Sequence, residues 1–322
     1  MKDSSSSRRE FLRGGLALGG LVAVSGLPAV ADDPSVFPAR GKFERLVLAY
    51  QHIDAGASKP FSILHISDTH LTEAYPDEGE MKLKLKTVRT QCFGGRQEEA
   101  LRDSLDWAKK NVDYVLHTGD LIDWQSRANF DLVKKYYGPG MFGSLGNHEY
   151  SRNMWLEKSE ITEAYKDGTR AAVAAAYPFD VKLSSNVVNG VNFVTLDDVY
   201  GYVTAEQVER FRAEVKKGLP IVLCMHVPFF TPMIWRAHYK FWRSSGRKFT
   251  SAAIPDARGD YQRQQTDPVT RDFISYLKGE PLLKGILAGH MHITVQDRFS
   301  PTAMQYVVGG NFMFHGQEVT FS

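Results

Sequence analysis

Five apolar stretches of the chain are each followed directly by a short polar segment that contains Asp, His or Asn. These stretches have the length and composition of buried β-strands, and segments of helical periodicity lie between them. The alternation predicts an α/β fold. The simplest arrangement is a four-layer α/β/β/α sandwich of two mixed β-sheets flanked by helices. In such folds ligands bind where strands end in loops, so the polar segments are expected to share one edge.

The expected elements follow from periodicity and turn signals. Apolar patterns predict strands at 45–53, 61–67, 112–118, 141–145, 179–183, 191–196, 221–225 and 285–288, with an antiparallel β meander over the last residues. Helical spacing predicts helices at 95–111, 129–137, 164–176 and 270–277, and a capping pattern opens a further helix at Thr204. Asn189-Gly190 predicts a tight hairpin turn. The stretch 228–267, crowded with aromatic and basic residues, is expected to be irregular.

The first 31 residues have the three parts of a signal peptide. A polar opening leads into Arg8-Arg9-Glu10-Phe11-Leu12, a glycine-rich apolar stretch covers 14–26, and Ala29-Val30-Ala31 supplies a small-residue cleavage site. The paired arginines resemble the twin-arginine export signal. The resemblance implies a bacterial protein that the twin-arginine machinery exports folded. Residues 1–31 would be the signal peptide, and 32–322 a single mature domain, periplasmic or secreted.

A transmembrane anchor is the alternative for the same segment. Its apolar stretch is shorter than the ~20 residues that span a bilayer, and glycines and Pro28 interrupt it. No later apolar run is long enough to cross a membrane, so the mature form is not expected to be membrane-spanning.

Charge and cysteine content exclude some classes of partner and fold. The formal net charge is +2, and the excess of Lys and Arg falls in the first 31 residues. The neutral remainder has no basic stripe, so no specific nucleic-acid partner is indicated. Two cysteines, Cys92 and Cys224, are too few for a disulfide framework. Cys224 lies in the apolar run 221–225, where a buried and inert thiol is expected.

Each polar segment, taken alone, also has a structural explanation. Asp68 and His70, one residue apart, fit a capping Asp beside a surface His. Gly119 lets the backbone turn tightly so that Asp120 points over the sheet edge, but such an Asp also opens ordinary loops. Asn147 offers a neutral oxygen ligand, although Gly-Asn is also a common turn.

The last two segments strengthen the metal-site interpretation. His226 ends an apolar strand, where a histidine is usually satisfied within the core. His290 and His292 would point the same way if extended, which suits two adjacent ions. Because all five segments follow a strand and offer an oxygen or nitrogen donor, together they predict a metal site. The donors include no thiolate, which favours Fe, Mn or Zn over Cu(I) or an iron–sulfur cluster.

In order and type, the segments resemble the motifs of the calcineurin-like metallophosphoesterase superfamily. The matching positions are Asp68-x-His70, Gly119-Asp120-x-x-Asp123, Gly146-Asn147-His148-Glu149, His226 and Gly289-His290-x-His292. The resemblance implies the metallo-dependent phosphatase fold and two divalent or trivalent metal ions. One ion would be bound by Asp68, His70 and His292. The other would be bound by Asn147, His226 and His290, and Asp120 would bridge the two. His148 would be catalytic, assisting the leaving group.

The implied reaction is hydrolysis of a small phosphoester, either a phosphodiester or a phosphomonoester. Two cations about 3.5–4 Å apart can share a water molecule and supply a bridging hydroxide that attacks phosphorus. His148, if protonated, can donate to the departing alkoxide. Asp123 or Glu149 could hold His148 in orientation. Arg152 could contact a phosphate oxygen, although a surface salt bridge is the commoner outcome for such a residue.

The second motif differs from that of two other branches of this superfamily. Ser/Thr phosphoprotein phosphatases continue the second motif with Asp-Arg-Gly, and purple acid phosphatases have Tyr where this chain has Asp123, so neither branch is favoured. The interval between His226 and His290 is the expected specificity element, because its aromatic and basic residues suit a base or sugar attached to phosphate. A loop that packs its aromatic residues on the body is at least an equal expectation. The alternative function is a metal-containing protein that binds a phosphorylated ligand without turnover. His65 and His117 lie within strands and are expected to be packed or hydrogen-bonded rather than catalytic.

Overall fold

The computed structural model describes residues 45–154, 162–244 and 255–322. The predicted signal peptide at 1–31 lies outside these residues, as does the predicted boundary at residue 32. No helix in the described ranges combines the length and the apolar character needed to cross a bilayer.

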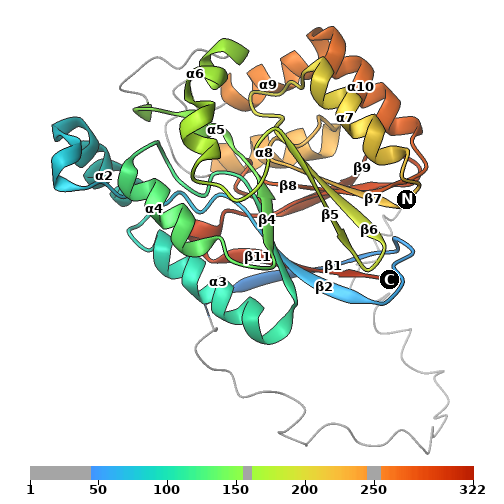
Figure 1. Cartoon of the computed structure of the whole chain (residues 1–322), viewed down its shortest axis with the longest axis horizontal. Coiled ribbons are helices and arrows are strands. Elements are labelled where there is room, and N and C mark those ends of the chain that lie inside the picture. The colour runs from blue at the N-terminus through green and yellow to red at the C-terminus, as the bar shows by residue number, and fades with distance from the viewer. Residues whose placement is uncertain (1–44, 155–161, 245–254) are drawn as a thin grey trace, which may run out of the picture. The chain divides into compact units, whose positions relative to one another are not determined.

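Two mixed β-sheets pack face to face with helices on their outer faces, as predicted (Figure 1). The first sheet has the order β1 (Val47–Ile53), β11 (His315–Phe321), β2 (Phe61–Ile66), β3 (Tyr114–Thr118), β4 (Met141–Ser144). The second has the order β5 (Leu183–Val188), β6 (Val191–Leu196), β7 (Ile221–Met225), β8 (Leu283–Ala288), β10 (Met304–Val307), β9 (Val295–Arg298). β2, β3 and β4 are parallel, as are β6, β7, β8 and β10.

The alternation of side chains along a strand explains the layered core. In β7, Val222 and Cys224 point into the space between the sheets, whereas Ile221, Leu223 and Met225 pack toward the outer helices. A strand that is buried on both faces must be apolar throughout, as this one is. The space between the sheets also contains the rings of Phe61, Phe142, Phe193 and Phe321.

Helices cover both outer faces of the sandwich. The first sheet is covered by α3 (Gln97–Asn111), α4 (Arg127–Tyr136) and α6 (Glu163–Ala174). The second is covered by α7 (Ala205–Val215), α8 (Pro232–Ser244), α9 (Pro255–Thr266) and α10 (Pro268–Gly279). The other helical elements of the described residues are η1 (Pro76–Glu78), α2 (Glu80–Cys92), α5 (Asn147–Tyr150) and η3 (Asn311–Met313). The predicted capping box at Thr204 and the hairpin turn between β5 and β6 are confirmed.

The prediction that 228–267 is irregular is wrong, because this stretch contains α8 and α9. Pro232 and Pro255 occupy the first positions of these helices. A proline is tolerated there, since the N–H that it lacks would have no partner in the first turn. Helix α2 is also absent from the predictions. Residues 81–86 alternate apolar residues with lysines, and this period of two is typical of a strand rather than of a helix.

Two strand predictions also need correction. The strand predicted at 179–183 begins only at Leu183, because Phe179 instead packs its ring against Tyr137 and Tyr177. The predicted terminal meander is wrong in part. β9 and β10 are antiparallel, but β11 crosses to the first sheet and lies between β1 and β2. An alternating pattern identifies a strand without identifying its partners.

Candidate metal centre

The five polar segments come together at the carboxyl ends of parallel strands. Asp68 follows β2, Asp120 follows β3 and Asn147 follows β4, three neighbouring strands of the first sheet. His226 follows β7 and His290 follows β8, which are neighbours in the second sheet. The edge that the sequence predicts is therefore built by both sheets.

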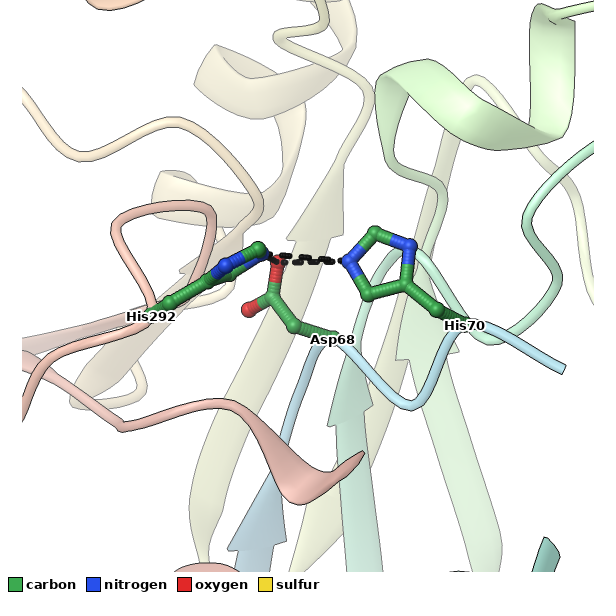
Figure 2. A group of neighbouring side chains, drawn as sticks. All are labelled: Asp68, His70 and His292. Atoms are coloured by element: carbon green, nitrogen blue, oxygen red, sulfur yellow. Dashed lines mark hydrogen bonds and ion pairs between the residues drawn. The ribbon is translucent and has the colours of Figure 1, made fainter. Parts of the chain in front are cut away.

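The first group of converging side chains is Asp68, His70 and His292 (Figure 2). Asp68 Oδ1 lies 3.3 Å from His292 Nε2 and 3.9 Å from His70 Nε2, and the two Nε2 atoms are 3.1 Å apart. His70 Nδ1 donates to Asp123 Oδ1 at 2.9 Å. The hydrogen of the neutral His70 ring therefore sits on Nδ1, and Nε2 keeps a lone pair for the group.

The second group is Asp120, His226 and His290. His226 Nδ1 donates to the carbonyl oxygen of Thr118 at 2.7 Å, which leaves Nε2 as the ring nitrogen that could bind a metal ion. This Nε2 lies 3.3 Å from Asp120 Oδ2 and 3.1 Å from His290 Nδ1. Three donor atoms again converge on one small volume.

Asp120 lies between the two groups. Its Oδ2 is 3.8 Å from His70 Nε2 in the first group and 3.3 Å from His226 Nε2 in the second. Gly119 makes this position possible, as predicted. It has a φ of +92°, and a Cβ on it would lie 2.6 Å from the Gly146 nitrogen and 2.7 Å from His226 Nδ1. One carboxylate can therefore reach both groups.

The backbone at this edge is strained. Five of the predicted ligands have φ between 54° and 67°, namely Asp68, His70, Asp120, His290 and His292. Residues other than glycine rarely adopt this left-handed conformation, which costs of order 1 kcal/mol or more each. Hydrogen bonds between the loops hold it in place, from Asp68 N to the Gly119 oxygen and from His70 N to the Asp120 oxygen. Strain of this kind gathers at functional sites.

The donor atoms fit hard or borderline cations. In the described part of the chain, Asp68 Oδ1 and Asn147 Oδ1 are buried and accept no hydrogen bond. A buried polar oxygen without a partner is costly, and a cation would satisfy both atoms. Asn147 opens α5 beside Asp120, whose Oδ1 accepts from the His148 amide at 2.9 Å. Oxygen and imidazole donors without a thiolate suit Fe, Mn or Zn.

Charge within the cluster shifts its titration. Burial raises the pKa of Asp68 and of Asp120, but neighbouring imidazoles outweigh burial and hold both below their usual range. Burial lowers the pKa of His226, but Asp120 outweighs it and raises that pKa to about 10. The buried carboxylates therefore remain ionised and attract positive charge.

His148 faces the same cluster but belongs to neither of these two groups. Its Nδ1 lies 2.9 Å from both the backbone oxygen and Oδ1 of Asp123, so Asp123 orients the ring, in the way the sequence suggested. Its Nε2 faces Asp120 Oδ2 at 3.8 Å. Burial lowers the pKa of His148, but Asp120 and Asp123 together raise it to about 9. These two carboxylates therefore favour the protonated form of the ring.

Arg89 of α2 is a residue of this site that the sequence did not reveal. Its Nη2 donates to Asp123 Oδ1 at 2.7 Å, and its Nε donates to Oδ2. His70, Asp123 and His148 form a third group that could hold a metal ion. The Arg89 guanidinium already neutralises this carboxylate and would repel a further cation. Asp123 is better explained as a shared hydrogen-bond acceptor, and no motif marks Arg89 in the sequence.

The predicted role of Glu149 in orienting His148 is not the one that the structure gives it. The Glu149 carboxylate accepts from the backbone N–H groups of Asp120, Leu121 and Gly146 at 2.7 to 2.9 Å. Burial, with a smaller contribution from Asp120, raises the pKa of Glu149 to about 7. Glu149 therefore holds together the two loops that carry Asp120 and Asn147.

The other predicted polar residues have partners elsewhere. Arg152 is exposed, and its guanidinium donates to the carbonyl of Gly168 in α6 at 3.3 Å, so the suggested phosphate contact has no support. His65 and His117 are buried and hydrogen-bonded to threonine hydroxyls, as expected. Burial lowers the pKa of each to about 3.

Two phenylalanines form an apolar wall beside the first group, and sequence reasoning missed both. The Phe93 ring stacks on His70 with centroids 4.2 Å apart and planes 11° apart. Phe312 contacts His292 edge to face, with centroids 5.1 Å apart, and also contacts Phe93. The wall joins the end of α2 to η3, segments far apart in the sequence, so no local pattern could have indicated it.

The family model for calcineurin-like phosphoesterases matches residues 61–294. No curated protein matches the sequence. Among solved structures, a dimetal phosphatase from Danio rerio is 14% identical with a TM-score of 0.45, over 79% of this chain and 88% of that one.

Two further structures resemble the chain at the same identity of 14%. A structure of PhoD has a TM-score of 0.47, over 80% of this chain and 58% of that one. A purple acid phosphatase from yellow lupin seeds has a TM-score of 0.45, over 80% of this chain and 45% of that one.

Proposed function

The chain belongs to the calcineurin-like phosphoesterase family, and on this basis we propose that it hydrolyses a small phosphodiester or phosphomonoester at two metal ions. The observation that carries the proposal is the position of Asp120. Its Oδ2 lies 3.3 Å from His226 Nε2 and 3.8 Å from His70 Nε2. A carboxylate in this place joins two groups of donor atoms into one centre.

The proposed ligands divide by group. One ion is held by Asp68, His70 and His292. The other is held by Asn147, His226 and His290. Asp120 bridges the two, and the donor set suits Fe, Mn or Zn in a divalent or trivalent state.

The chemistry divides between the ions and His148. When bound, two cations would lower the pKa of a shared water and neutralise charge that grows on the phosphoryl oxygens. Asp123 fixes the His148 ring through Nδ1, and the protonated Nε2 faces the cluster. His148 can therefore deliver a proton to a departing alkoxide. A protein that only binds a phosphorylated ligand would need no such proton donor.

Hydrolysis of model substrates tests the proposal. The purified protein, loaded with Mn²⁺, is assayed with bis(p-nitrophenyl) phosphate and with p-nitrophenyl phosphate. His148→Ala is expected to lower kcat by about 10²- to 10⁴-fold without loss of metal, because it removes only a proton donor. Asp120→Asn is expected to lower both metal content and kcat. His52→Ala, which alters an exposed histidine on β1, is the matched control and should leave both unchanged.

The outcomes separate an enzyme from a binding protein. Turnover of either substrate that depends on His148 supports the proposal. If the metal-loaded wild type binds phosphate but hydrolyses neither ester, the alternative of a binding protein without turnover is correct. A wild-type protein that binds no metal ion would overturn both the ligand assignment and the proposed hydrolytic activity.

We also propose that the protein is exported. Residues 1–31 act as a cleaved twin-arginine signal peptide, and the domain at 32–322 functions in the periplasm or outside the cell. The support is the sequence pattern of Arg8-Arg9 followed by an apolar stretch and Ala29-Val30-Ala31. Folded export would allow metal to be loaded before the protein leaves the cytoplasm.

A further inference from the structure

Helix α9 places a carboxylate against the outer nitrogen of a proposed metal ligand. His290 turns Nδ1 toward the second group, 3.1 Å from His226 Nε2. Its other ring nitrogen, Nε2, points away from that group and lies 3.2 Å from Asp260 Oδ2. Asp260 is buried, with 5% of its surface exposed. No motif of the metal site includes Asp260, which lies within the stretch 228–267.

The neighbouring chain fixes the position of Asp260. A Cβ on Gly201, which has a φ of +74°, would lie 2.6 Å from the Asp260 Cα, so α9 packs directly on the backbone of this glycine. Arg263, on the next turn of α9, donates to the carbonyl oxygen of Tyr200. The helix is therefore attached at two points to the loop that joins β6 to α7.

The same loop also holds the second histidine of the group. Asp198 Oδ1 accepts from the backbone N–H groups of His226 and Val227 at 3.0 and 3.1 Å. The loop 198–201 therefore supports His226 directly and His290 through Asp260. Both histidines of one metal group depend on a single structural unit that lies outside the sequence motifs.

We propose that Asp260 is a positioning residue for the second metal ion, fixing the ring of His290 so that Nδ1 faces that ion. The inference rests on the proposed two-metal function. A histidine that binds a metal through one nitrogen commonly donates the hydrogen of its other nitrogen to a carboxylate, which fixes the tautomer and makes the ligand more basic. Asp123 has this relation to His70 in the first group, at 2.9 Å. With Asp260, each group contains one histidine supported in this way.

Asp260 makes α9 part of the support of the metal centre. Loss of a carboxylate in this position typically weakens metal binding by about 10- to 100-fold. Because Asp260 contacts His290 and not the first group, a variant without this carboxylate should lose affinity for only one of the two ions.

Equilibrium dialysis against Mn²⁺ tests this on the full protein, with metal content measured at each concentration. Wild type is expected to bind two ions. Asp260→Ala should bind one ion as wild type does and the other about 10- to 100-fold more weakly. Asp260→Asn keeps an oxygen that can accept from Nε2–H and should lose less affinity. Gly201→Ala adds a Cβ that would clash with the backbone of Asp260. This variant keeps the Asp260 carboxylate and should weaken the binding of the same ion.

Asp267→Ala is the matched control. Asp267 caps α10, where its side chain accepts from Thr270 N at 2.8 Å. This variant should lower the melting temperature and leave both metal affinities unchanged. If Asp260→Ala binds two ions with wild-type affinity, the role of Asp260 is wrong and the proposed function still stands. The same holds if the binding of both ions is weakened equally. A wild type that binds fewer than two ions would overturn the proposed function first, and the inference with it.

Discussion

Arg89 and Asp123 form a buried ion pair in which one guanidinium contacts both oxygens of one carboxylate. The side chains expose only 7% and 0% of their surfaces. The same carboxylate oxygen, Oδ1, also lies 2.9 Å from the Nδ1 atoms of His70 and His148. Arg89 thus stabilises the charge on which the orientation of both histidines depends. Helix α2 takes part in the site through this single residue and the Phe93 ring that follows it.

Replacing Arg89 should therefore destabilise the fold and disturb the site together. Arg89→Ala leaves a buried carboxylate without its cation, and the expected loss of stability is about 3–5 kcal/mol. Arg89→Lys keeps the charge but cannot contact both oxygens in one plane, so an intermediate loss is expected. Urea unfolding measures the stability of both variants. Their rates of p-nitrophenyl phosphate hydrolysis should fall in the same order as their stabilities.

Arg127→Ala is the control for that series. Arg127 pairs with Asp77, but both side chains are more than half exposed, and such pairs contribute little. The urea midpoint and the activity should stay at the wild-type values. If Arg89→Ala is as stable as Arg127→Ala, the buried pair does not have the importance assigned to it.

Export should depend on the paired arginines. Arg8→Lys combined with Arg9→Lys keeps the positive charge but removes the twin-arginine pattern, so the protein should remain in the cytoplasm with its first 31 residues attached. Cell fractionation and N-terminal sequencing measure this. Arg13 lies outside the pair, so the Arg13→Lys variant should be exported normally, and its mature chain should begin at Asp32. Export of the double variant at the wild-type level would contradict the assignment.

The sequence predicted the location of the site because the relevant signals are local. Each proposed ligand lies within four residues of the end of the strand that it follows, and parallel neighbours in a sheet bring their carboxyl ends to one edge. Gly119 before Asp120 is likewise a local signal, since its φ of +92° suits glycine. The alternating βα pattern similarly indicated two sheets with helices outside.

The parts that were missed depend on contacts between distant segments. Arg89 meets Asp123 only after α2 packs on the loop that follows β3, and the start of α2 alternates apolar residues with lysines as a strand would. Asp260 meets His290 through α9, in a stretch predicted to be irregular. β11 alternates like any edge strand, yet it pairs between β1 and β2 of the first sheet. Tertiary packing decides such contacts, and residue spacing does not encode it.

The two thiols should differ sharply in reactivity. Cys92, at the end of α2, is exposed, whereas Cys224 lies between the two sheets, where burial raises its pKa well above the usual value. A thiolate is the reactive form, so a disulfide reagent at pH 8 should label one thiol in the native protein and two after denaturation in guanidinium. The variant Cys92→Ser should show no labelling until it is denatured. Labelling of both thiols at one rate in the native protein would contradict the buried position of Cys224.

Glu149 should matter more for folding than for catalysis. Its carboxylate accepts from the N–H groups of Asp120, Leu121 and Gly146 and from the Tyr177 hydroxyl. In Glu149→Gln one oxygen becomes an NH₂ group that faces donors, and unfolding by urea should show a loss of about 2–4 kcal/mol. Tyr177→Phe removes one donor, keeps the carboxylate and should cost only about 1–2 kcal/mol. At a temperature where both variants are folded, kcat of Tyr177→Phe should equal that of wild type. Equal stability of Glu149→Gln and wild type would show that these N–H groups do not need a charged acceptor.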